Sequence, residues 1–253
     1  MSGDWTTLHD RLHRTLKQRK LLSSGEKLLI AVSGGQDSLC LMRLLLDLQP
    51  HWHWQLGIAH CNHQWRSDSD ANAAQVESIA QIYELSFYSA IATQATTSEA
   101  AARDWRYSAL AEIAHQHDYT AVVTGHTQSD RAETLLYNLV RGSGMDGLQA
   151  LPWKRRLTEN LWLVRPLLNV ARSETAEFCQ TQNLPVWEDS TNQDWQHARN
   201  RIRQELLPYL QQHFNPQVDR TLAQTSELLR ADVEFLEAAT DALWLQVVDS
   251  GRV

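Results

Sequence analysis

The feature that most constrains the fold is a glycine-rich stretch, SGGQDS at residues 33–38, between an apolar run at 27–32 and another at 38–47. The first run predicts a buried strand and the second predicts a helix. Two adjacent glycines at such a junction let the backbone turn tightly and approach a ligand closely. The amide groups that open the helix then favour a negative charge at one spot. The stretch therefore predicts a phosphate-binding loop.

Strand-like and helix-like segments alternate around this loop. Strands are expected at 27–32, 55–59, 87–92 and 120–124, and helices at 38–47, 70–84, 96–117 and 130–140. This alternation implies right-handed crossovers and an α/β fold, a doubly wound parallel sheet with helices on both faces. Residues after 199 are almost wholly helical. We expect a catalytic domain over 1–210 and a helical C-terminal appendage over 211–253.

The cysteines and the charge narrow the class further. Cys40, Cys61 and Cys179 form no C-x-x-C pair, and their odd number argues against a disulfide framework and for a reducing, cytoplasmic setting. No apolar run resembles a membrane span or a secretion signal, so no membrane partner is expected. The formal net charge of −7 argues against nucleic acid, but a local basic face can still bind phosphates.

Asp37 is the unusual member of the loop. A carboxylate beside a phosphate is repelled unless a cation lies between them, so Asp37 indicates Mg²⁺. The alternative is an ordinary strand–turn–helix junction in which serine and aspartate cap the helix. There is no Walker A sequence, and the G-x-G-x-x-G match at 142–147 follows a helix, whereas a dinucleotide site follows a strand.

Three further blocks carry polar groups. Two of them follow expected strands, at the carboxyl edge where open α/β sheets bind ligands. They contain His60, Asn62, His63 and Arg66, and then Gly125, His126, Asp130 and Glu133. Acidic groups at a helix start can also be simple dipole partners. The third block is basic, with Arg199, Arg201 and Arg203. It is either a solvated helix face or, with Lys154, Arg155, Arg156 and Arg165, a track for a nucleic-acid backbone.

The loop resembles that of the N-type ATP pyrophosphatases, the PP-loop family, which bind the pyrophosphate part of ATP there. Further motifs follow in order: H-x-N-H-x-x-R at 60–66, ARDWRYSAL at 102–110, RGSGMDGL at 141–148, RPLL at 165–168, EDSTN at 188–192 and RNRIR at 199–203. Together they resemble the tRNA(Ile)-lysidine synthetase family from about residue 27 to 210.

The resemblance implies a ligase reaction. The family adenylates the C2 oxygen of the wobble cytidine in the CAU anticodon of a minor isoleucine tRNA with ATP. The amine of L-lysine then attacks C2, and the products are lysidine, AMP and diphosphate. The resemblance thus implies ATP and Mg²⁺ as cofactors, isoleucine tRNA and L-lysine as partners and a cytoplasmic location, and it admits a homodimer.

The resemblance also implies roles for individual residues. The expected catalytic residues are Asp37, His126, Asp130 and Arg199. The expected ATP-binding residues are Ser33, Gly34, Gly35, Gln36, Asp37, Ser38, His60 and Gly125. The expected tRNA-binding residues are Arg66, Arg103, Arg106, Arg141, Arg155, Arg156, Arg201 and Arg203. Asp37 and Asp130 are the expected metal ligands.

One block departs from the family pattern. The family commonly reads H-H-x-D-D-Q-x-E-T, and this chain has Thr127, Ser129 and Arg131 in place of the second histidine, the first aspartate and the glutamine. Asp130 alone would have to serve there. Two other classes remain open. A PP-loop tRNA thiolation enzyme would need paired cysteines, and a non-enzymatic nucleotide-binding module would not need the RNRIR block.

Overall fold

The computed structural model describes residues 5–64, 68–93, 98–187 and 198–250. The chain divides into two compact units. The first comprises residues 1–127 and 152–194, and the second comprises residues 128–151 and 195–253. Each unit groups residues that pack against one another. The boundary after residue 210, between a catalytic domain and an appendage, stays a prediction.

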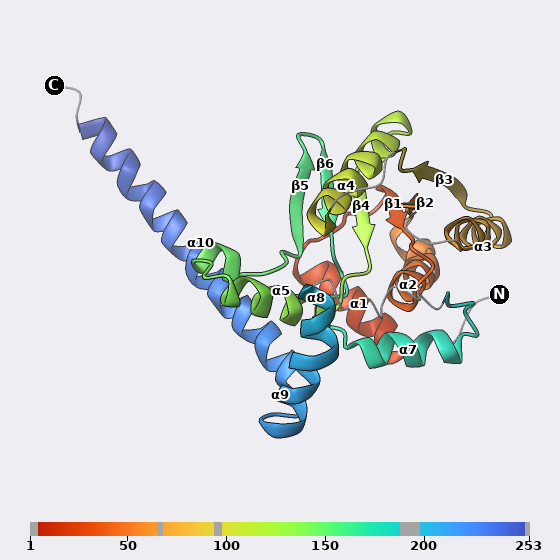
Figure 1. The fold of residues 1–253 in the computed structure, drawn as a ribbon. Helices are drawn as coiled ribbons and strands as arrows, with labels where there is room; N and C mark the ends of the chain where they lie inside the picture. The colour runs from red at the N-terminus through yellow and green to blue at the C-terminus, as the bar shows by residue number, and fades with distance from the viewer. Residues whose placement is uncertain (1–4, 65–67, 94–97, 188–197, 251–253) are drawn as a thin grey trace. The chain divides into compact units, whose positions relative to one another are not determined.

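The first unit is built on a six-stranded sheet in the order β3-β2-β1-β4-β6-β5 (Figure 1). Its strands are β1 (Lys27–Ala31), β2 (Gln55–Asn62), β3 (Ser86–Ile91), β4 (Ala121–Thr124), β5 (Lys154–Thr158) and β6 (Leu161–Val164). Neighbouring strands pair in parallel, except that β5 and β6 form an antiparallel hairpin at one edge. The α/β fold with a mostly parallel sheet is confirmed, and the antiparallel edge strand β5 is an addition to it.

Five helices of the first unit surround this sheet. They are α1 (Thr7–Gln18), α2 (Gln36–Trp52), α3 (Ser69–Ile82), α4 (Glu99–Gln116) and α7 (Arg172–Thr181). The chain passes from β1 to β2 to β3 in one direction and then crosses back to β4. Because parallel crossovers are right-handed, α2 and α3 cover one face of the sheet and α4 covers the other. The doubly wound arrangement is therefore present.

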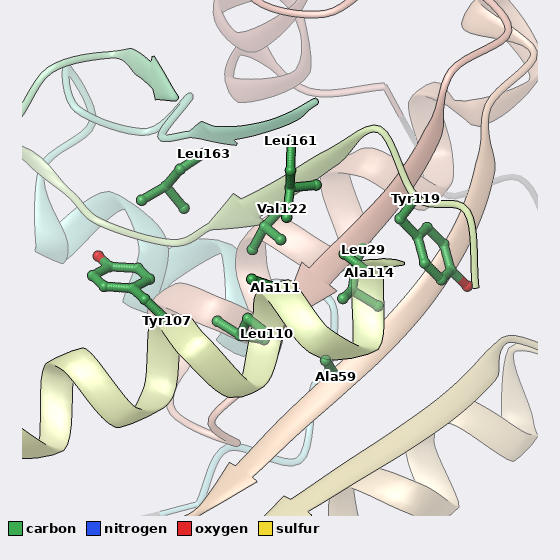
Figure 2. Close-up of a cluster of buried hydrophobic side chains, with 10 residues drawn as sticks. All are labelled: Leu29, Ala59, Tyr107, Leu110, Ala111, Ala114, Tyr119, Val122, Leu161 and Leu163. Carbon is green, nitrogen blue, oxygen red and sulfur yellow. The ribbon is translucent and has the colours of Figure 1, made fainter. Parts of the chain in front are cut away.

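The strands bury an apolar layer beneath α4. Leu29, Val122 and Leu163, from three different strands, pack with Leu110 and Ala114 of α4 (Figure 2). Successive side chains of a strand point to opposite faces, so the residues between them are buried against the helices of the other face. Because helices cover both faces, the strands are held rigidly, and their carboxyl ends can position the residues of a binding site.

The strand order reverses between β1 and β4, which are neighbours in the sheet although β2 and β3 come between them in the chain. Ligands of open α/β sheets bind at the carboxyl end of such a switch point. The glycine-rich loop follows β1, and Gly125 and His126 follow β4. The fold thus brings two of the expected site segments to the position where a ligand is expected.

The second unit is wholly helical in its described residues. It contains α5 (Gln128–Val140), α6 (Met145–Leu148), α8 (Ala198–Arg201), the π-helical segment η2 (Ile202–Leu206), α9 (Leu207–His213) and α10 (Val218–Ser250). Ala132 and Leu136 of α5 share a small core with Ile202 and Leu207. The helical character predicted after residue 199 is confirmed. Among the described helices, none has the length and apolar character needed to cross a membrane.

Candidate active site

The glycine-rich stretch forms a tight loop between β1 and α2. Gly34 has a φ of +88°, which L side chains rarely adopt, and Gly35 directly precedes the first turn of α2. The backbone N–H of Ser33 donates to Ser38 Oγ at 3.1 Å, and that hydroxyl donates to the Gly35 carbonyl at 2.8 Å. Ser38 therefore ties the two ends of the loop together and fixes the amide groups at the start of the helix.

Two residues that the sequence pattern did not single out support this loop. Asn72 of α3 donates from Nδ2 to the Ser33 carbonyl at 3.0 Å, and the backbone N–H of Trp187 donates to the Gly34 carbonyl at 3.0 Å. A Cβ atom on Gly34 would lie only 2.2 Å from Asn72 Oδ1. Gly34 is thus required both for the backbone conformation and for the close approach of Asn72.

The carboxylate of Asp37, in the first turn of α2, is held by α7. Thr175 Oγ1 donates to Asp37 Oδ1 at 2.5 Å, and Arg172 Nε lies 3.6 Å from Asp37 Oδ2. The side-chain amide of Gln36 donates to the Arg172 carbonyl at 2.9 Å and joins the same two helices. Thr175 and Arg172 are positioning residues that no local signal reveals, because Thr175 lies 138 residues from Asp37 in the chain.

The position of Asp37 fits a magnesium-bound triphosphate. Mg²⁺ in nucleotide sites is usually held by one or two carboxylates together with substrate phosphates. Among the described residues, no group of three or more potential metal ligands is gathered in one place. A single carboxylate beside a phosphate-binding loop matches the usual arrangement. The second expected metal ligand, Asp130, belongs to the other unit.

His60 and Gly125 lie directly beside the loop. His60 Nδ1 donates to the Val32 carbonyl at 2.8 Å, and since a carbonyl only accepts, this nitrogen carries the proton. A Cβ atom on Gly125 would lie 2.7 Å from the backbone oxygen of Asp37. His126 follows, with Nδ1 at 2.8 Å from the hydroxyl of Thr124. These expected site residues are therefore all found at the switch point.

A second polar cluster joins the end of β2 to α4. Arg106 Nε donates to His63 Nε2 at 3.2 Å, and the His63 ring packs edge-on against Trp105 with centroids 4.6 Å apart. Burial, and then the charge of Arg106, lowers the pKa of His63 to about 4. His63 is therefore a neutral acceptor at neutral pH. The expected tRNA contact Arg66 lies outside the described residues.

We expect His63 to stay neutral as the pH falls through 6. Its pKa in the fold, about 4, lies below the ordinary value of 6.5, so the unfolded state binds more protons between these values. The contribution of His63 to stability therefore falls as the pH drops from about 6.5 to 4. NMR titration of the His63 ring measures this, and a midpoint above 6 contradicts it. His63→Gln, which keeps an acceptor for Arg106, should lose this pH dependence.

In the second unit, Arg203 is held by two carboxylates. Its Nε and Nη2 donate to the two oxygens of Glu133 at 2.6 and 2.9 Å, and Nη2 also donates to Asp130 at 3.3 Å. The Glu133 side chain is only 4% exposed, so this bidentate pair is largely shielded from water. The structure thus brings Asp130, an expected metal ligand, together with Arg203, an expected tRNA contact.

Two of the residues that depart from the family pattern have partners in α10. Arg131, 2% exposed, forms an ion pair with Glu227 at 3.0 Å and donates to the Leu151 carbonyl at 2.9 Å. Ser129 donates to Asp219 at 3.2 Å. Through these contacts Ser129 and Arg131 join α5 to α10.

The remaining basic residues are divided between the units. The first unit holds Arg103, Arg106, Lys154, Arg155 and Arg156, and the second holds Arg141, Arg199 and Arg201. Arg141 and Arg199 both approach the ring of Tyr137. The prediction that Arg165 lies on a basic surface track is wrong, because this side chain is fully buried. The EDSTN motif lies outside the described residues.

The loop geometry and the switch point agree with what known proteins show. Residues 6–210 match the family described as the PP-loop domain. The chain also shares its fold with the U34-tRNA thiolase NcsA from Methanococcus maripaludis, with a TM-score of 0.72 over 88% of this chain and 78% of that chain. At 14% identity, that likeness concerns the fold alone. The fold and the site define a PP-loop, ATP-binding α/β protein.

Sequence comparison narrows this class. The chain is 62% identical to a tRNA(Ile)-lysidine synthase of a Nostoc species, over 94% of this chain and 70% of that protein. It is 52% identical to the tRNA(Ile)-lysidine synthase of a Synechocystis species, over 95% of this chain and 74% of that protein. It is 39% identical to the chloroplastic tRNA(Ile)-lysidine synthase of Zygnema circumcarinatum, over 90% of this chain and 63% of that protein. The chain belongs to the tRNA(Ile)-lysidine synthase family of PP-loop proteins.

Proposed function

We propose that this protein converts the wobble cytidine in the CAU anticodon of a minor isoleucine tRNA into lysidine, with ATP and L-lysine as co-substrates. The observation that carries this proposal is the 62% identity to a tRNA(Ile)-lysidine synthase across 94% of the chain. The loop at residues 33–38 supports it, because it offers the amide groups and hydroxyls that a leaving diphosphate needs.

The proposed reaction has two steps. The C2 oxygen of cytosine attacks the α-phosphorus of ATP, and diphosphate leaves. The neutral amine of lysine then attacks C2, loses a proton and displaces AMP. The target base must leave the anticodon stack to reach the nucleotide. In the first step, the start of α2 would stabilise the negative charge that develops on the diphosphate.

We assign the residues at the switch point to ATP. Ser33, Gly34, Gly35, Gln36, Ser38, His60 and Gly125 would line the nucleotide, and Asp37 would hold Mg²⁺. Bound Mg²⁺ neutralises the triphosphate and favours attack at phosphorus. Thr175 and Arg172 would keep the Asp37 carboxylate at the loop. His126 and Arg199 would act as catalytic residues that stabilise developing negative charge.

Release of AMP from purified components tests the proposal. We expect AMP only when both L-lysine and the CAU-anticodon isoleucine tRNA are present, together with the matching mass increase of the wobble nucleoside. AMP release that requires a sulfur donor instead of lysine would support tRNA thiolation. Nucleotide binding without AMP release under any of these conditions would support a non-enzymatic module.

The cysteines favour lysidine formation over thiolation. A thiolation enzyme needs reactive thiolates, and reactive thiols have lowered pKa values and solvent access. Here burial raises the pKa of Cys61 to about 11. A hydrogen bond with Cys40 lowers the pKa of Cys179, but both of these thiols are buried and lack the solvent access that a reactive thiol needs. We further propose that the protein is cytoplasmic and that it forms a homodimer. Light scattering on the purified protein tests the homodimer.

Arg201→Ala is expected to weaken tRNA binding and to leave ATP affinity unchanged. Arg201 is exposed in the second unit, whereas the ATP loop belongs to the first. Loss of one phosphate contact lowers the slope of log affinity against log salt by about 1. Glu205→Ala, which removes an exposed charge of opposite sign nearby, is the control that should not lose affinity. A tRNA dissociation constant unchanged in Arg201→Ala at physiological salt removes Arg201 from the binding face.

A further inference from the structure

Three arginines surround Tyr107 in the first unit. The guanidinium carbons of Arg103 and Arg155 lie 5.5 and 5.1 Å from the centre of the tyrosine ring, and Arg165 Nη2 donates to its hydroxyl at 3.3 Å. We call these four residues the Tyr107 cluster. Figure 2 shows Tyr107 on the same helix as Leu110, Ala111 and Ala114, at one end of the apolar layer.

Arg165 forms the buried base of the Tyr107 cluster. Its side chain is 0% exposed, and Nη1 donates to the Pro152 carbonyl at 2.9 Å. Its buried Nε has no acceptor among the described residues. A guanidinium group withdrawn from water is costly unless it is paired with a negative charge. The position of Arg165 therefore calls for an anion in its neighbourhood.

The described part of the chain supplies no such anion. No described aspartate or glutamate forms an ion pair with Arg103, Arg155 or Arg165. Burial lowers the pKa of Arg165; the Tyr107 hydroxyl opposes this, and the charges of Arg155 and Arg103 add to it. Burial raises the pKa of Tyr107, but the three arginines outweigh it and leave that pKa below its ordinary value. The Tyr107 cluster therefore carries an excess of positive charge.

We infer that the Tyr107 cluster binds a phosphodiester group of the tRNA, with Arg103 and Arg155 in contact with it and Arg165 and Tyr107 behind them. This inference rests on the proposed function and deepens it. Arg103 and Arg155 are only partly buried, so a ligand can reach their guanidinium groups. A guanidinium group binds two phosphate oxygens in parallel, and Arg165 adds positive potential from below.

The Tyr107 cluster lies at the same edge of the sheet as the ATP loop. Arg165 directly follows β6, and Arg155 is paired with Leu163 of β6. Since β6, β4 and β1 run parallel, the carboxyl ends of β6 and β1 share this edge. Two strand spacings separate β6 from β1, which is roughly 10 Å. A phosphate bound there belongs to the nucleotides around the target cytidine, and holding it would steady the strand beside the extruded base.

Arg155 and Arg156 lie on opposite faces of β5 and contact different aromatic rings. Successive side chains of a strand point to opposite faces, and Arg155 lies over Tyr107 while Arg156 lies over Trp162 at 3.9 Å. Only Arg155 belongs to the Tyr107 cluster. If both bind tRNA, they contact different phosphates.

Single neutral substitutions test the phosphate site. Arg103→Gln and Arg155→Gln should each raise the tRNA dissociation constant about tenfold and flatten the log–log salt slope by about 1, with ATP affinity unchanged. The matched control is Lys27→Gln. Lys27 makes a similar contact with the ring of Tyr119 at 4.9 Å, but at the start of β1, on the opposite edge of the sheet. This control should leave tRNA affinity and salt slope unchanged.

Neutral methylphosphonates at single positions of an anticodon stem-loop identify the phosphate. One replacement next to the wobble cytidine should weaken binding to the wild-type protein and cause no further loss in Arg103→Gln, because both remove the same contact. Additive losses at every position overturn the inference. A raised KM for lysine with unchanged tRNA affinity also overturns it, because the cluster would then hold the lysine carboxylate. The series on wild-type protein requires no variant to fold.

The wild-type protein separates this inference from the proposed function. If it neither binds tRNA nor releases AMP with lysine, the proposed function is wrong, and the phosphate site with it. If it does both, and Arg103→Gln and Arg155→Gln bind tRNA as Lys27→Gln does, only the phosphate site is wrong. Thermal melting of each variant confirms that the comparison is made between folded proteins.

Discussion

Asp37→Asn is expected to reduce AMP formation about a thousandfold or more while changing the free energy of unfolding by less than about 1 kcal/mol. Asparagine has the same shape and keeps an oxygen for the Thr175 hydroxyl, so the contact at 2.5 Å can survive. The substitution does remove the negative charge that would face a cation on ATP. The contact with Arg172, at 3.6 Å and partly exposed, contributes little to stability. Chromatographic AMP assays and urea denaturation measure the two effects.

Asp10→Asn is the matched control for this change. Asp10 is an exposed carboxylate that, like Asp37, lies in the first turn of a helix, here α1, so the chemical change is the same and the helical setting is similar. We expect neither turnover nor stability to change appreciably in this variant. Turnover near the wild-type level in Asp37→Asn would exclude a required metal-linked role for Asp37.

The loop and the parallel core of the fold were predictable because their signals are local. The apolar run at 27–32, two adjacent glycines and a second apolar run lie within about 20 residues of sequence, so one strand, one turn and one helix follow from short-range patterns. The right-handed crossover rule then places Gly125 and His126 at the same edge without further information. Helical periodicity likewise predicted the segment after residue 199.

The edge strand β5 lacked such a signal. Its sequence, KRRLT, contains one apolar residue, and the alternation expected of a half-buried strand is absent. The structure shows the reason: each arginine lies against an aromatic ring and is partly covered without being apolar. Arg165 misled for a related reason. Arginine is rarely fully buried, and only the fold shows that the Pro152 carbonyl and the Tyr107 hydroxyl accept hydrogen bonds from Arg165.

The supports of the candidate site could not be predicted for a different reason. Asn72, Arg172 and Thr175 act on the loop through contacts between distant segments, and none of them carries a motif of its own. The same holds for Arg131, whose ion pair with Glu227 joins two segments far apart in the chain. One sequence records which residue is present, whereas such pairings require the folded chain.

Gly34→Ala is expected to lower ATP affinity at least about tenfold and to destabilise the first unit by about 2 kcal/mol. The backbone at φ +88° is strained for any residue with a Cβ, which costs about 1–2 kcal/mol. The added methyl group would also lie 2.2 Å from Asn72 Oδ1, so the Asn72 amide must move and lose its hydrogen bond to the Ser33 carbonyl. The loop then loses the support that aims its amide groups. Titration with a non-hydrolysable ATP analogue and urea denaturation measure both effects.

Gly25→Ala separates the strain from the contact. Gly25 has a similar φ of +79°, but a Cβ there would meet nothing within 4 Å, so this variant should lose about 1 kcal/mol of stability and keep its ATP affinity. Gly34→Ala combined with Asn72→Ala removes the clash but not the strain. Part of the stability lost in Gly34→Ala should therefore return in the double variant, a coupling that two independent sites would not show. Equal ATP affinities for Gly34→Ala and Gly25→Ala would mean that the close packing of Asn72 on the loop has no part in binding the nucleotide.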